Sequence, residues 1–305
     1  MIEIVAAGVA GVGVYAALVE PRRLTRRRLT VASPLLAAGW RPLRAVVVSD
    51  LHAGWPHVTE ARLARLAAAM LAERPDVILL PGDFVCEGAL GTRPLAIEAV
   101  AEALAALPAA VPTFAVLGNH DRDIGARRVA AALAAVGIVV LYNRAEALPR
   151  PGGAVWIAGV DCARTGRPDV GRALAGRSRG DAVILLSHIP DLIHRVPDWV
   201  ALTVAGHTHG GQVCLPGLGP LVTMSRLPRR MARGLHRIGD RHLFVSTGIG
   251  TSGLPLRLGA TPELAVLDLV PAQDPASRVM ETVAPAGTVT VAVASSRPSS
   301  TAVTR

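Results

Sequence analysis

Lysine is absent from this sequence of 305 residues, so all 32 of its basic side chains are arginine. That absence excludes reactions through a Schiff-base lysine and nucleotide sites that depend on a Walker-type lysine. There are only three cysteines and no CxxC pair, which excludes a disulfide scaffold and a zinc ribbon. Aromatic residues make up only 3% of the chain, so stacking platforms are scarce and we expect no nucleic-acid partner.

Charged residues are also few, at 18%, whereas hydrophobic residues reach 51%. A chain this apolar can bury a core large enough to offset its conformational entropy, so it is not intrinsically disordered. The net charge is +9. With so few aromatic residues, this positive balance favours an anionic lipid surface or a phosphorylated substrate as partner.

The N-terminal region combines an uncharged run with a cluster of basic side chains. Residues 4–19 carry no charge, and five arginines follow them: Arg22, Arg23, Arg26, Arg27 and Arg28. We predict a membrane anchor over residues 1–20 and a basic juxtamembrane segment over residues 21–43. Because a spanning helix usually needs about 20 apolar residues, a buried N-terminal helix is the alternative.

The same arginines predict an orientation. Under the positive-inside rule they keep the following domain on the cytoplasmic face of the inner membrane, where they would attract anionic headgroups. We therefore expect a catalytic domain at the cytoplasmic membrane surface.

From residue 44 onward, short β-branched runs alternate with alanine-rich stretches of helical periodicity, a pattern typical of an α/β fold. We assign residues 44–270 to one catalytic domain. Residues 271–305 lose this periodicity and are rich in proline, serine and threonine, which predicts a disordered C-terminal tail.

Polar side chains follow five of the strand-like runs, at the point where each run ends. They are Asp50, His52, Asp83, Asn119, His120, Asp121, His188, His207 and His209. In open α/β sheets ligands bind beyond the carboxyl ends of the strands, so we expect these side chains to converge on one crevice.

Carboxylate and amide oxygens together with neutral imidazoles suit divalent ions such as Zn, Mn or Fe. A carboxylate such as Asp83 can bridge two ions, which together acidify a water molecule enough to attack phosphorus. The pattern therefore predicts hydrolysis of a phosphate ester.

Five motifs, taken in order, resemble the signature of the calcineurin-like metallophosphoesterase superfamily: Asp50-x-His52, Gly82-Asp83, Gly118-Asn119-His120-Asp121, His188 and Gly206-His207-Thr208-His209. The resemblance spans about residues 44 to 270. The stretches GHTHGGQ and FVSTGIGTSGLPLRLGATPEL are similar to a bacterial branch of membrane-associated phosphodiesterases, which includes UDP-2,3-diacylglucosamine pyrophosphatases. The resemblance implies a four-layer α-β-β-α sandwich, in which helices flank two mixed β-sheets.

The resemblance also implies a role for each residue of the set. One divalent ion would be held by Asp50, His52 and His209, a second by Asn119, His188 and His207, and Asp83 would bridge them. The ions could be Mn, Zn, Fe or Ni. His120 would face the substrate and protonate the leaving oxygen, with Asp121 holding its other ring nitrogen. Capping of a helix is the alternative role for Asp121.

Two departures bear on the substrate. Protein phosphatases of the superfamily carry an arginine shortly after the Gly-Asp motif, and Glu87 stands there in this chain. A negative charge at that place disfavours a dianionic monoester and favours a diester or pyrophosphate. Further along, Arg226, Arg229 and Arg230 are candidates for binding the substrate, or belong to a solvated loop.

We predict an in-line attack on a phosphodiester or pyrophosphate by a hydroxide that bridges two metal ions, at the membrane. UDP-2,3-diacylglucosamine, an intermediate of lipid A synthesis, or another lipid-linked ester is the predicted substrate. The alternative is a small-molecule or cyclic-nucleotide phosphodiesterase. A non-catalytic scaffold is the least favoured, because a scaffold does not need so complete a set of ligands.

Overall fold

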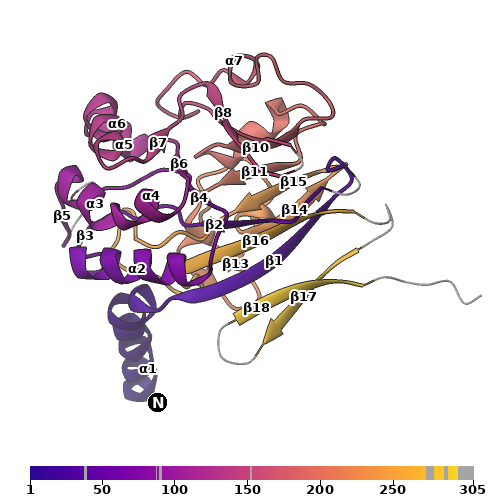
Figure 1. The fold of residues 1–305 in the computed structure, drawn as a ribbon. Coiled ribbons are helices and arrows are strands. Elements are labelled where there is room, and N and C mark those ends of the chain that lie inside the picture. Colours follow the sequence, from indigo (N-terminus) through magenta and orange to yellow (C-terminus); the bar gives the residue numbers. More distant parts are fainter. Residues whose placement is uncertain are drawn as a thin grey trace, which may run out of the picture.

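The computed structural model describes residues 1–37, 40–86, 88, 91–151, 153–272, 278–284 and 288–294 (Figure 1). Two mixed β-sheets form the centre of the fold. The larger has eight strands, in the order β17 (Arg278–Ala284), β18 (Thr288–Ala294), β1 (Thr25–Ser33), β16 (Glu263–Pro271), β2 (Leu43–Val47), β4 (Val77–Leu80), β6 (Thr113–Ala115) and β7 (Val139–Val140).

The second sheet has six strands, in the order β14 (Gly234–Ile238), β15 (Arg241–Val245), β11 (Leu202–Ala205), β10 (Ala182–Leu186), β9 (Val155–Gly159) and β8 (Arg144–Leu148). Two short ribbons pair β3 (Gly54–Trp55) with β5 (Arg93–Pro94), and β12 (Cys214–Leu215) with β13 (Gly219–Pro220). Both large sheets contain parallel and antiparallel neighbours, as predicted.

Helices cover the outer faces of the two sheets. They are α2 (Glu60–Ala72), α3 (Ile97–Leu104), α4 (Ala106–Ala110), α5 (Asn119–Asp123), α6 (Ala126–Ala135) and α7 (Val170–Ala173), with short 3-10 turns η3 (Pro190–Arg195), η4 (His209–Gly211) and η5 (Arg229–Met231). Helix α2 begins at Thr59, whose hydroxyl accepts a hydrogen bond from the Arg62 amide, and its apolar stripe is buried.

Three layers of core hold these elements together. Along β2, Val46 packs toward the helices with Leu63 of α2, whereas Ala45 and Val47 pack between the two sheets. A third cluster, which contains Leu185, lies on the outer face of the six-stranded sheet. Successive residues of a strand point to opposite faces of its sheet. Each sheet therefore contributes side chains to the core on both of its faces. The predicted four-layer α-β-β-α sandwich is confirmed.

The N-terminal boundary of the domain differs from the prediction. Instead of a juxtamembrane segment, residues 25–33 form β1, which pairs in parallel with β16 along its whole length. The alternation of the strand explains how it accommodates its arginines. Arg28 points toward the helix layer and lies 2.7 Å from Glu73, while Leu29 and Val31 are buried between the sheets.

The residues before β1 are also tied to the domain. Helix α1 (Ile2–Val14) projects away from the body of the molecule, and a π-helical turn η1 (Tyr15–Val19) and a 3-10 turn η2 (Glu20–Arg22) follow it (Figure 1). The buried Glu20 carboxylate accepts hydrogen bonds from the Gly259 and Ala260 amides at 3.0 and 2.9 Å. Within the described ranges, no helix has the length and apolarity that crossing a membrane requires.

The C-terminal region also differs from the prediction. We expected a disordered tail over residues 271–305, but residues 278–284 and 288–294 form β17 and β18, an antiparallel pair at the edge of the larger sheet next to β1. The prediction for residues 273–277, 285–287 and 295–305 lies outside the described residues.

The position of β1 predicts how two truncations will differ. Deleting residues 2–14 removes only the projecting helix, so we expect the melting temperature to shift by less than about 4 °C, equivalent to roughly 1 kcal/mol. Deleting residues 2–43 removes Glu20 and an inner strand, and we expect no cooperative unfolding transition. Calorimetry of both proteins checks this. A folded, metal-binding protein without residues 2–43 would contradict the assignment of β1 to the domain.

Candidate metal centre

The predicted ligands follow strands of both sheets at their carboxyl ends. Asp50 and His52 follow β2, Asp83 follows β4, Asn119 and His120 begin α5 after β6, His188 follows β10, and His207 and His209 follow β11. The two sheets therefore contribute to one centre, as the sequence predicts. Every one of these side chains is buried except that of His120, which is 14% exposed.

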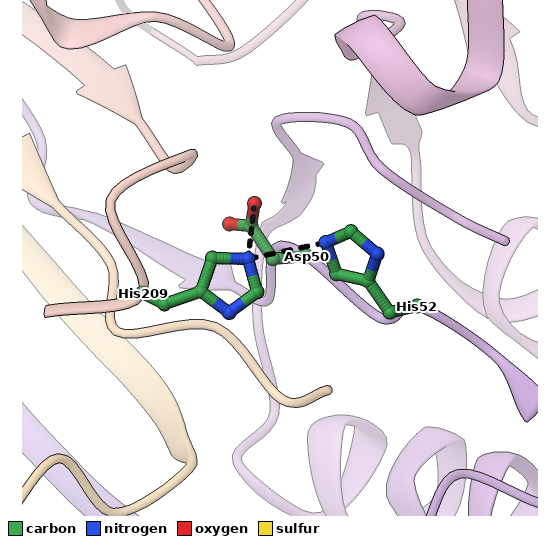
Figure 2. A group of neighbouring side chains, drawn as sticks. All are labelled: Asp50, His52 and His209. Carbon is green, nitrogen blue, oxygen red and sulfur yellow. Dashed lines mark hydrogen bonds and ion pairs between the residues drawn. The ribbon is translucent and has the colours of Figure 1, made fainter. Parts of the chain in front are cut away.

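Asp50, His52 and His209 form one group of possible ligands (Figure 2). The His52 and His209 rings point toward each other, with their Nε2 atoms 3.1 Å apart, and His209 Nε2 lies 3.6 Å from Asp50 Oδ1. Asp50 is held in place because its carboxylate accepts the His207 amide at 3.0 Å. Three donor atoms thus face one small volume.

Asp83, His188 and His207 form a second group. His188 Nε2 lies 3.1 Å from Asp83 Oδ2, and the other ring nitrogen, Nδ1, is 2.8 Å from the Pro81 carbonyl oxygen. A proton on Nδ1 leaves Nε2 free to act as a ligand, as is usual for histidines that bind metals. Among the described residues, the buried Asn119 Oδ1 has no hydrogen-bond partner.

Burial governs the protonation of these groups. It lowers the pKa of His52 to about 3, and burial together with the nearby charges of His188 and Arg164 lowers the pKa of His207 to about 3. Burial alone would raise the pKa of Asp83, but the imidazoles around it reverse the shift and lower it. The centre thus presents an ionised carboxylate and neutral imidazoles, the forms in which these side chains bind metal.

His188 is the exception among the histidines. Burial disfavours its charged form, but the adjacent Asp83 carboxylate outweighs burial and raises the pKa of His188 to about 10. The carboxylate thus favours a proton on the His188 imidazole. A divalent ion would compete with that proton, so metal binding at this position releases it.

The backbone at the centre adopts a conformation that non-glycine residues rarely take. Asp50, His52, Asp83, His207 and His209 have φ angles between 38° and 71°. Left-handed conformations of this kind cost of order 1–3 kcal/mol each and persist only where the surroundings hold them. Their concentration at the predicted ligands marks this centre as the functional site.

Two glycines allow the close packing around Asp50. A Cβ atom at Gly206 would overlap the Ser49 hydroxyl and the Asp50 carboxylate, and one at Gly248 would lie 2.7 Å from Asp50 Cβ. Gly248 also has a φ of +68°. The glycines of the Gly-His-Thr-His motif and of the later Gly-Ile-Gly stretch are therefore needed for space as well as conformation.

The hydrogen bonds that Asp121 accepts come from the backbone. Its carboxylate accepts three backbone amides, those of Asp83, Phe84 and Gly118, each at 2.8 Å. It caps the start of α5 and ties the loop after β4 to the loop after β6. The capping alternative is therefore the one that the contacts support, and Asp121 positions other residues.

His120 lies at the border of the centre. Its Nε2 is 4.0 Å from Asp83 Oδ2, and its Nδ1 is 3.8 Å from Asp123 Oδ2. Together with His52 and Asp83 it also belongs to a third group of possible ligands. The ring is more accessible than those of the other site histidines, and it lines the cavity above the centre.

That cavity has a volume of about 540 Å³ and reaches Asp83, Asn119 and His207. The predicted substrate-binding residues Arg226, Arg229 and Arg230 do not line it, and Arg230 lines a second cavity instead. Arg164 lines it instead. The prediction for Glu87 lies outside the described residues.

The residues present fit divalent ions. Asn119 Oδ1 is a buried oxygen without a partner among the described residues, the histidines are mostly held neutral, and oxygen and imidazole donors form a mixed set. No cysteine belongs to any of the groups found in the described part of the chain. The centre is therefore a candidate site for divalent metals.

The chain was compared with known proteins. The family model for calcineurin-like phosphoesterases matches residues 43–211. The chain is 31% identical over 258 residues to the uncharacterized metallophosphoesterase YkuE of Bacillus subtilis, which covers 84% of this chain and 88% of that protein. The chain belongs to the calcineurin-like phosphoesterase family.

The chain is also similar to two further proteins. Phosphodiesterase YaeI of Escherichia coli is 32% identical over 238 residues, covering 75% of this chain and 83% of that protein. Sulfate thiohydrolase SoxB of Thermus thermophilus superposes with a TM-score of 0.45 at 18% identity, over 74% of this chain and 56% of that one. From its family and its ligand groups, the chain is a metal-dependent phosphoester hydrolase.

Sequence reasoning missed Arg257, the largest fully buried side chain of this phosphoesterase. Its guanidinium donates to the carbonyl oxygens of Gly250, Thr247 and Ala260, and Nη2 lies 3.3 Å from His209 Nδ1. It thereby joins the loop after β15 to the turn that carries His209. The position within the sequence LPLRLG carries no pattern that would reveal this role.

Two substitutions separate a metal ligand from a residue that faces the substrate. We expect Asp83→Asn to lose bound metal and at least about 10³-fold in rate, because a negative charge between the two groups is removed. We expect His120→Ala to keep its metal and to slow the reaction least for substrates with good leaving groups. Elemental analysis of both variants beside steady-state rates makes the comparison. Near-normal turnover by Asp83→Asn would contradict its central role.

Proposed function

We propose that this phosphoesterase uses two divalent ions to hydrolyse a phosphodiester or pyrophosphate. The observation that carries the proposal is the position of one oxygen atom. Asp83 Oδ2 is 3.5 Å from His52 Nε2, in the first group of possible ligands, and 3.1 Å from His188 Nε2, in the second. A single carboxylate within reach of both groups suits a bridge between two ions.

The ions would supply an acidified water molecule and neutralise the charge that develops on phosphorus oxygens. The chain's own residues hold the reacting groups. His120 lines the cavity with Nε2 inward, so it can hold the proton that the leaving oxygen takes up. Asp123 Oδ2 lies 3.8 Å from His120 Nδ1, while Asp121 fixes the backbone from which the ring projects.

Part of the cavity wall is apolar, which supports an ester with an apolar group as the substrate. Leu221, Val222 and Met224 line this wall, and each is between 41% and 61% exposed. Exposed apolar side chains beside a reactive centre are typical of a surface that binds an apolar ligand. A lipid-linked substrate such as UDP-2,3-diacylglucosamine is therefore our first candidate, and a small or cyclic-nucleotide diester is the second.

We propose that the enzyme works at the cytoplasmic face of the inner membrane. The apolar helix α1 supports this, since Val9, Val12 and Val14 are at least half exposed to solvent. Arg22 and Arg23 follow close behind, where they can meet anionic headgroups.

Arg164 is our candidate for holding the phosphoryl group, in place of the arginine that other family members carry near Glu87. Its loop is built around the buried Asp161, which accepts the Cys162 and Arg167 amides at 2.8 and 2.6 Å. Asp161 also pairs with Arg122 at 2.8 Å, which joins this loop to α5 and His120. The loop therefore presents a permanent cation at the mouth of the cavity.

The proposed reaction is tested by product analysis with metal-loaded protein. We expect Mn²⁺-dependent hydrolysis of bis(p-nitrophenyl) phosphate that is faster than hydrolysis of p-nitrophenyl phosphate, and release of UMP from UDP-2,3-diacylglucosamine. Val222→Thr, a change of similar volume, should slow only the diacylated substrate. Faster turnover of the monoester would contradict the proposed diesterase, whereas diester hydrolysis without UMP release would favour the second candidate.

Replacing Arg164 tests its proposed contact with the substrate. We expect Arg164→Ala to raise KM for the diester about 10-fold, equivalent to about 1.4 kcal/mol, at unchanged metal content. Arg167→Ala is the matched control, because Arg167 belongs to the same loop but lines a different cavity. An equal change of KM in both variants would mean that the loop, and not the Arg164 charge, is responsible.

A further inference from the structure

A second cavity, of about 600 Å³, lies between β1 of the larger sheet and β14 of the six-stranded sheet. Arg27 of β1 lines one side, and Arg230 of η5 and Arg233, which precedes β14, line the other. None of the candidate metal ligands lines it. We name it the basic cleft, defined by these three arginines together with Glu263.

The charges in the basic cleft do not balance. The buried Glu263 carboxylate is its acidic group, and it is already used, since it lies 3.1 Å from Arg27 Nε and accepts the Thr247 amide at 2.9 Å. Arg233 donates to the neutral Gly259 carbonyl oxygen. Within the described part of the chain, neither Arg230 nor Arg233 forms an ion pair, so two guanidinium charges in the cleft remain uncompensated.

The turn of residues 208–211 lies between the metal cavity and Arg233 of the basic cleft. Thr208 and His209 line the metal cavity, and the Thr208 hydroxyl donates to the Ala232 carbonyl oxygen at 2.6 Å. Behind the turn, a Cβ at Gly210 would lie 3.3 Å from Arg233 Cδ. The two cavities have no lining residue in common, so a ligand bound in the cleft leaves the metal cavity open.

The cleft also adjoins the N-terminal segment. Gly259 and Thr261 line it, and both donate to the Glu20 carboxylate, at 3.0 and 3.3 Å. Glu20 precedes the start of β1 by only a few residues. The mouth of the cleft thus lies close to the base of helix α1.

We propose that the basic cleft binds a phosphomonoester dianion at a site separate from the metal centre. Two uncompensated guanidinium groups match two negative charges, and their planar donor forks suit phosphoryl oxygens. A free phosphate or the headgroup of a lipid such as phosphatidic acid presents this chemistry. The proposal does not depend on which ester the metal centre cleaves.

Inorganic phosphate is the first probe, titrated calorimetrically into metal-loaded, full-length protein. Any phosphate that binds at the metal centre does so in every variant. A difference between variants therefore reports on phosphate binding in the basic cleft. We expect wild type and Arg229→Ala to bind one more equivalent of phosphate than Arg230→Ala, or to bind it at least about 10-fold more tightly. Arg229 is the matched control, because it is the neighbouring exposed arginine of the same turn and does not line the cleft.

The second probe is a set of vesicles. Phosphatidylcholine vesicles that contain phosphatidic acid are compared with vesicles that contain phosphatidylglycerol at equal surface charge. We expect Arg230→Ala to weaken sedimentation with phosphatidic acid more than with phosphatidylglycerol, and Arg230→Lys to restore part of the loss. If Arg230→Ala and Arg229→Ala differ only in binding phosphate, the ligand of the cleft is a free phosphate compound. If they differ only in binding vesicles, the ligand is a lipid headgroup.

The proposal is overturned if the two alanine variants behave alike with both probes. In that case the arginines contribute only a general positive charge. Because Arg230 is exposed and forms no ion pair with a described residue, its loss should leave the fold intact, and an unchanged melting temperature verifies this.

Discussion

The structure depends on holding five polar residues in a left-handed backbone conformation at the edge of two sheets. Asp50, Asp83 and His209 each carry this strain, and each is fixed by groups from a different part of the chain. Asp121 accepts the Asp83 amide, Gly248 packs against Asp50, and Arg257 contacts His209. The energy that maintains the centre therefore comes from buried hydrogen bonds and close packing around it. The four-layer core provides the rigid support these contacts need.

The need to hold the backbone at His209 in its left-handed conformation explains why the N-terminal segment belongs to the enzyme. Glu20 accepts the backbone amides of Gly259 and Ala260, and the Ala16 carbonyl oxygen accepts the Arg257 amide at 2.9 Å. Through Arg257, this segment supports the turn that carries His209. A region that resembles a detachable anchor in sequence is thus continuous with the metal centre in space, while only helix α1 stands apart.

The arginines serve different purposes according to their surroundings. Arg28 pairs with an acid on the helix layer, Arg257 is a buried link between loops, and Arg164 faces the substrate cavity. The net charge of +9 is therefore not distributed evenly over the protein surface. We propose that the metal cavity holds the reacting ester and that the basic cleft holds a dianion. This proposal follows from the positions of the guanidinium groups that lack an acidic partner among the described residues.

The sequence alone was enough to predict the α/β class, the strands that precede each candidate ligand and the convergence of these side chains on one centre, because apolar periodicity and polar strand ends are local patterns. It did not reveal β1, because the arginines of this strand resemble the basic flank of a membrane segment. Only the structure shows that alternate residues of the strand are buried. Nor did the sequence reveal Arg164, Glu20 and Arg257, or separate Arg230 from the metal cavity. These roles come from contacts between residues up to 241 positions apart. Such contacts are decided by how the two sheets pack, and no pattern within a single segment records that packing.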